Sequence, residues 1–124
     1  MKITQNEINE IVGSEVVRAS SSLDLFAIEL SGERALVLEA QLDGTDAVIV
    51  PSVVPASDMP FSKEAVCAVD WSWIYGSSIS QVSISEEQVK LSFDPHGPVT
   101  VAVSVWQGKP FLSFMPYKAP PRLI

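Results

Sequence analysis

Apolar and polar residues alternate in short runs along most of this chain, and residues that favour turns separate the runs. A period of two is the pattern of a strand with one buried face. The clearest run covers residues 99–106, in which valines occupy every second position. Residues 34–42 alternate in the same way. The side chains expected to face the core in this second run are Leu36, Leu38, Ala40 and Leu42.

The alternation predicts eight strands of ordinary length. They are expected at residues 15–20, 23–30, 34–42, 46–50, 77–84, 89–93, 99–106 and 111–115. The strongest turn signals are Asp43-Gly44 and residues 94–98, because glycine takes a positive φ without steric cost and proline fixes φ. Pro51 is expected to end the fourth strand, and residues 51–62 are expected to form an ordered, proline-containing connecting loop.

A short helix is expected ahead of each group of four strands. Thr4 and Glu7 have the spacing of a capping box, in which each side chain satisfies a backbone N–H at the start of a helix. Apolar residues follow at i, i+3 and i+4, and Gly13 can end the helix in the left-handed conformation. The first helix is therefore predicted at residues 5–12.

The second helix is predicted at residues 71–75, with Asp70 as its N-cap. Trp71 and Ile74 would share one face of this helix, and Trp73 would point away from it. Trp71 and Ile74 are therefore assigned to the core. Trp73 is kept as a candidate contact residue.

Each predicted helix and the four strands after it resemble a repeated unit. The six glycines pair in order, at offsets of 63, 65 and 64 residues, as Gly13 with Gly76, Gly32 with Gly97, and Gly44 with Gly108. Duplication explains this spacing, and so does coincidence between the turns of any meander.

The prediction is thus one α+β domain, mainly antiparallel β, with repeated units at about residues 4–51 and 67–116. An extended tail is expected at residues 117–124. A barrel-like sheet and two packed layers are both compatible with the pattern.

The chain is acidic, with a formal net charge of −7 and a pI near 4.5. Residues 1–62 hold ten acids and three bases, whereas residues 63–124 hold five of each, so the excess negative charge belongs to the first half. This balance argues against nucleic-acid binding, which needs clustered lysine and arginine. No apolar stretch approaches the roughly 20 residues of a membrane span. A single cysteine and no signal-peptide pattern favour the cytoplasm.

Residues that carry catalysis or bind metals are sparse. His96 is the only histidine and lies in the turn at 94–98; Asp94 could orient it, but no nucleophile stands at a recognisable spacing. One histidine and one cysteine are too few for a zinc site, and Cys67 lies in an apolar run typical of a buried thiol. Residues 43–46 resemble a calcium loop but lack most of its oxygen ligands. We therefore predict no metal and no cofactor, and we favour a protein that is not an enzyme.

The function that these features favour is contact with a basic protein partner through the acidic first half, as in a protein of the immunity or antitoxin type. The residues proposed for this contact are Glu29, Glu39, Asp43, Asp46, Trp73 and Trp106. Trp106 falls on the outward face of its strand, where we expect the tail or the connecting loop to cover it.

Two other functions stay open. One is a small-ligand-binding protein or enzyme with a pocket between the two halves. Its candidate residues are Asp58, Asp70, Trp73 and His96. The other is a homodimer or structural module that associates through an edge strand or an exposed aromatic face.

Overall fold

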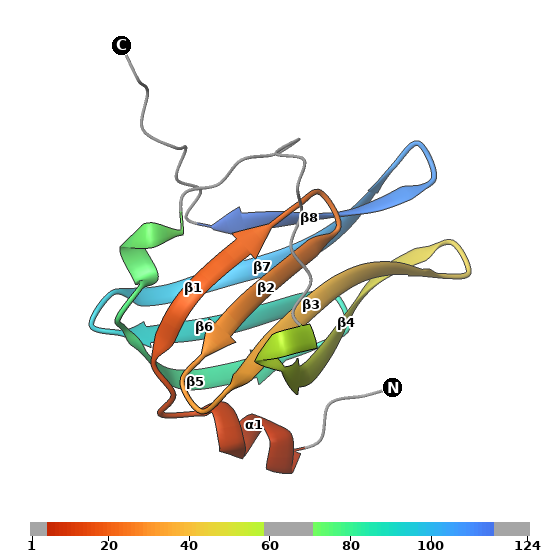
Figure 1. The fold of residues 1–124 in the computed structure, drawn as a ribbon. Helices are drawn as coiled ribbons and strands as arrows, with labels where there is room; N and C mark the ends of the chain where they lie inside the picture. The colour runs from red at the N-terminus through yellow and green to blue at the C-terminus, as the bar shows by residue number, and fades with distance from the viewer. Residues whose placement is uncertain (1–4, 59–70, 116–124) are drawn as a thin grey trace.

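Two four-stranded antiparallel sheets lie face to face in the computed structural model of the protein, which describes residues 5–58 and 71–115 (Figure 1). The first layer contains α1 (Gln5–Ile11), β1 (Val16–Ser21), β2 (Leu25–Leu30), β3 (Arg34–Asp43), β4 (Asp46–Pro55) and the 3-10 turn η1 (Ala56–Asp58). The second contains the 3-10 turn η2 (Ser72–Ile74), β5 (Ser78–Ile84), β6 (Gln88–Asp94), β7 (Gly97–Trp106) and β8 (Lys109–Met115). Each sheet is a meander with its strands in chain order. The prediction of a mainly antiparallel β protein is confirmed, and the described strands close no barrel.

The inner faces of the two sheets form one apolar core. Alternate side chains of β3 are buried in it, as the period of two predicts, and Val99 and Val101 of β7 lie in the same cluster. The prediction is wrong for Leu42, which follows the alternation but is 45% exposed. The buried cluster extends along β3 only as far as Ala40, so the last inward position of this strand lies beyond the core.

Aromatic rings fill one end of the core. The rings of Phe26 and Trp71 stack with their centroids 4.4 Å apart, and Phe114 meets both of them edge-on. The indole Nε1 of Trp71 donates a hydrogen bond to Ser21 Oγ over 2.9 Å. Trp71 and Ile74 are buried, so their assignment to the core is confirmed.

Four backbone hydrogen bonds close a corner between the two sheets. The residues that lead into β1 run antiparallel to those that lead into β5. The N–H groups of Gly13, Gly76, Val16 and Ile79 donate to the carbonyls of Ile79, Val16, Ser77 and Ser14 over 2.7, 2.9, 2.8 and 2.9 Å respectively. Each bond therefore has a counterpart in which the half that donated the hydrogen bond now accepts it.

The two sheets also repeat one register at a constant offset of 63 residues. Val16 pairs with Leu30 and Ile79 pairs with Phe93, and a bulge follows each pair along the first strand. In this register the counterpart of Gly13 is Gly76, as the glycine spacing suggested. Gly32 and Gly44 instead correspond to Pro95 and Gln107, so pairing them with Gly97 and Gly108 is wrong by two residues and by one.

Turns of each sheet cover the edge strand of the other. The Ile49 N–H of β4 donates to the Glu86 carbonyl in the β5–β6 turn over 2.7 Å. The Leu112 N–H of β8 donates to the Leu23 carbonyl in the β1–β2 turn over 2.8 Å. Such bonds occupy backbone groups that an edge strand would otherwise offer to another chain.

The fourth strand does not end at Pro51, as the prediction had it, but continues to Pro55. β4 is an edge strand, and the Ile49 N–H points away from β3 because it bonds to Glu86. Backbone N–H groups two residues apart point the same way, so Pro51 removes no donor from the β3–β4 ladder. The expected loop therefore begins after Pro55, with η1, and its last four residues, 59–62, lie outside the described chain.

The first helix is confirmed, since α1 covers Gln5–Ile11. The second is shorter than predicted: η2 is a single 3-10 turn, and Tyr75 after it is extended, with φ −62° and ψ 136°. The N-cap position of η2 is Trp71, and the predicted cap, Asp70, lies outside the described residues. Within the described ranges, no helix is both long and apolar enough to cross a membrane.

We expect Trp71→Ala to lower the free energy of unfolding by about 3–5 kcal/mol, because it removes a buried ring that packs against two others. Trp106→Ala is the matched control, since the Trp106 side chain is 70% exposed. This control should change stability by less than about 0.5 kcal/mol. Urea unfolding of both variants tests the assignment, and equal losses would contradict it.

Candidate functional site

The acidic half of the sequence becomes one layer of the sandwich. Residues 5–58 contain ten acids and two arginines, a net charge of −8, whereas residues 71–115 contain three acids and two lysines, a net charge of −1. Both arginines are already engaged: Arg18 Nε lies 2.5 Å from Glu29 Oε1, and Arg34 forms an ion pair with Glu10. The first layer therefore presents a strong excess of carboxylates to solvent.

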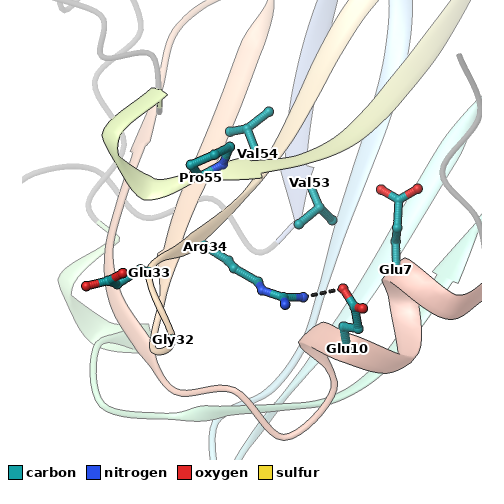
Figure 2. A pocket seen from close by; sticks show the side chains of 8 residues that line it. All are labelled: Glu7, Glu10, Gly32, Glu33, Arg34, Val53, Val54 and Pro55. Atoms are coloured by element: carbon teal, nitrogen blue, oxygen red, sulfur yellow. Dashed lines mark hydrogen bonds and ion pairs between the residues drawn. The ribbon is translucent and has the colours of Figure 1, made fainter.

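A hollow of about 390 Å³ opens in this layer where α1, the β2–β3 turn and the end of β4 meet (Figure 2). Glu7 and Glu10 border it from α1, and Glu33 borders it from the turn, on the opposite side, with its carboxylate directed away from Arg34. Arg34 lies between them. The apolar lining of the hollow comes from the end of β4, namely Val53, Val54 and Pro55.

The local backbone explains why these groups meet. Glu7 and Glu10 are three residues apart in α1, so they lie on one face of the helix. Leu30 pairs with Arg34 across the β2–β3 turn, which leaves a three-residue loop that ends in Glu33. Arg34 also pairs with Pro55, which places the end of β4 beside that loop. The Arg34–Glu10 ion pair then joins α1 to β3.

Glu33 has a backbone conformation that L-residues avoid. Its φ is +63°, directly after Gly32 with φ +84°. The left-handed region costs a residue with a Cβ roughly 1–2 kcal/mol. Gln107 in the β7–β8 turn takes the same conformation, with φ +51°, and it also lies beside a glycine of positive φ. The left-handed conformation of Glu33 therefore belongs to the geometry of the hairpin turn and costs some stability.

The hollow is suited to a cationic side chain. Its carboxylates can accept hydrogen bonds from an ammonium or guanidinium group, and its apolar lining can pack against the methylene stem behind that charge. Among the described residues no group of three or more histidine, cysteine, aspartate or glutamate side chains is arranged to hold a metal ion.

The four predicted acidic contact residues all lie in the first layer, but in different places. Glu29 is on the outer face of β2, in the ion pair with Arg18. Glu39 is exposed on the outer face of β3. Asp43 and Asp46 face each other across the last rung of the β3–β4 hairpin. None of them lines the hollow.

The two predicted aromatic contact residues differ from expectation. Trp73 does not point away from the core; it is half-buried and packs against it, and its ring meets that of His96 edge-on with centroids 6.2 Å apart. Trp106 faces outward, as the alternation predicts, but it is 70% exposed, so the expectation of a covered ring is wrong.

The hollow is not the pocket expected between the two halves, because every residue that lines it belongs to the first half. Of the residues named for that pocket, Trp73 and His96 are in contact, Asp58 is exposed in η1, and Asp70 is outside the described residues. The sequence reasoning missed the residues of the hollow. The i, i+3 spacing of Glu7 and Glu10 could have indicated that one helix face contributes two acids to the hollow.

No protein-family model, no curated protein and no solved structure matches this chain.

We expect Glu33→Gly to raise the free energy of unfolding by about 0.5–1 kcal/mol, because glycine adopts the left-handed conformation without strain. Part of this stabilisation is lost because glycine makes the unfolded chain more flexible. Glu33→Ala is the control: it removes the same charge but keeps a Cβ at φ +63°, and should leave stability within about 0.5 kcal/mol. Thermal and urea unfolding compare the two. Equal gains would assign the effect to charge and not to the backbone.

Proposed function

We propose that the protein acts in the cytoplasm by protein–protein contact and binds a basic partner through its acidic first layer. The observation that carries the proposal is the difference in charge between the layers, −8 against −1 over the described residues, with both arginines of the first layer held in ion pairs. Complementary charge speeds the encounter of two proteins and disfavours wrong partners.

Two acidic areas lie at opposite ends of β3, and we propose that both contact the partner. At one end the hollow has acids on both sides of the Arg34–Glu10 ion pair, and its apolar wall could pack against the stem of a lysine or arginine side chain from the partner. At the other end Asp43 and Asp46 are exposed, and Glu39 lies between the two areas on the outer face. Ten residues of extended strand span about 30 Å, which is within the footprint of an ordinary protein interface.

A protein that neutralises or inhibits a basic enzyme, of the immunity or antitoxin type, is one instance of such a binder. We also infer that the two halves are copies of one unit. The constant 63-residue offset of rungs, bulges and corner bonds supports this inference. In that alignment Glu10 corresponds to Trp73 and Asp46 to Lys109, so the acidic surface belongs to one copy.

A small cationic ligand is a second candidate for the hollow, because acidic side chains and an apolar wall lie together there. Such a ligand would use the same carboxylates, and a free amine should then bind without any protein partner. Calorimetry with arginine or a diamine separates the two candidates.

Charge reversal tests the proposal. The variant Glu33→Lys/Glu39→Lys changes two exposed acids of the first layer, and Glu86→Lys/Glu87→Lys makes the same charge change in the second layer. With a captured basic partner, we expect the first variant to weaken binding at least about tenfold and the second by less than about threefold, because only the first layer faces the partner.

The measurement is affinity capture from lysate at low and high ionic strength, followed by titration of the captured protein. Binding that is indifferent to salt, an acidic partner, or equal losses in both variants would contradict the proposal.

A further inference from the structure

The two long hairpins, β3–β4 and β7–β8, extend past the body of the sandwich on the same side (Figure 1). Their stems belong to the core: β4 contacts β7, and β3 contacts β8. Their tips are equivalent in the 63-residue offset, since the last rungs are Asp43 with Asp46 and Trp106 with Lys109.

The inward side chains of both tips lie beyond the core and are open to solvent. The buried cluster and the residues packed on it end at the rungs Ala40–Ile49 and Val103–Leu112. The next inward rungs pair Leu42 with Ala47 and Val105 with Pro110, about 7 Å further out. Leu42 is 45% exposed and Val105 is 41% exposed, although strand alternation directs both of them inward.

The two tips carry opposite charges. Asp43 and Asp46 stand directly opposite each other, and two like charges in that position destabilise a hairpin. The equivalent rung of the second tip holds Lys109 and the most exposed tryptophan of the described chain, Trp106. A cation placed between the two aspartates would relieve their repulsion.

We propose that this end of the protein binds a second copy of the same chain, tip to tip, about a two-fold axis. A two-fold rotation can bring the acidic tip of each copy against the basic tip of the other. Lys109 then meets Asp43 and Asp46 twice in one interface, and Trp106, Leu42 and Val105 are covered. Because the contact is self-complementary, it closes as a dimer and leaves no tip free to add a third copy.

The area available makes this dimer weak. Interfaces of standard size bury about 800 Å² per partner from roughly 20–30 residues. Six residues from each tip, 42–47 and 105–110, supply about half of that area. We therefore expect a weak dimer that exchanges with the monomer and is strongly sensitive to salt.

Sedimentation velocity of the purified 124-residue chain, without any partner, tests the proposal from about 10 μM to 1 mM, because mass action populates a weak dimer at the upper end of this range. We expect monomer and dimer in exchange, with less dimer at high salt. Lys109→Glu should weaken the dimer at least about tenfold, since it turns two attractive contacts into repulsive ones. Lys90→Glu is the matched control, an exposed lysine of β6 with the same charge change, and should leave the dimer unchanged.

A triple variant provides the rescue. Asp43→Lys/Asp46→Lys/Lys109→Glu inverts both tips and should restore the dimer of the unmodified chain. A monomer at every concentration, species larger than a dimer, equal effects of the two lysine variants, or no rescue by the triple variant would each overturn the proposal. Asp43 and Asp46 also belong to the surface proposed for the basic partner. The test uses the purified chain alone, so its outcome does not depend on that partner.

Discussion

The corner where the leads of β1 and β5 pair is the constraint on which the sandwich depends. Four backbone hydrogen bonds fix the two sheets against each other there, and they do so reciprocally. The first turn of each sheet also reaches the far edge strand of the other sheet, where it accepts a backbone hydrogen bond. The same geometry brings α1 beside the β2–β3 turn, where the hollow forms. The candidate site thus combines local geometry, namely the spacing of Glu7 and Glu10 in α1 and the β2–β3 loop, with contacts between segments distant in sequence.

Much of the fold could be predicted because strand alternation is a local property of the chain. The inward positions of β3 as far as Ala40 and the burial of Trp71 and Ile74 were predicted from residue spacing. The extent of β4 could not be predicted, because proline is tolerated at Pro51 only when the N–H position it replaces points away from the neighbouring strand. That direction is decided by which strand forms the edge of the sheet.

The candidate site was harder to predict from the sequence, for a related reason. The acidity of the first half is visible in the composition, and the structure turns it into the acidity of one layer. Which acids converge depends on contacts between segments that are distant in sequence, such as Arg34 with Glu10. The exposure of Trp106 also follows from tertiary structure, because alternation shows only that the ring faces outward and not whether another segment covers it.

The reciprocal closure of the edges has a consequence for how the surface can change. Its bonds join backbone to backbone, so they place no chemical demand on the side chains that carry them. Leu23 and Glu86 accept equivalent hydrogen bonds at equivalent positions, although one side chain is apolar and the other is charged. A fold closed in this way leaves its outer residues free to vary in one half without disturbing the other. One backbone arrangement can therefore carry two layers of different charge, as the −8 and −1 of the described residues show.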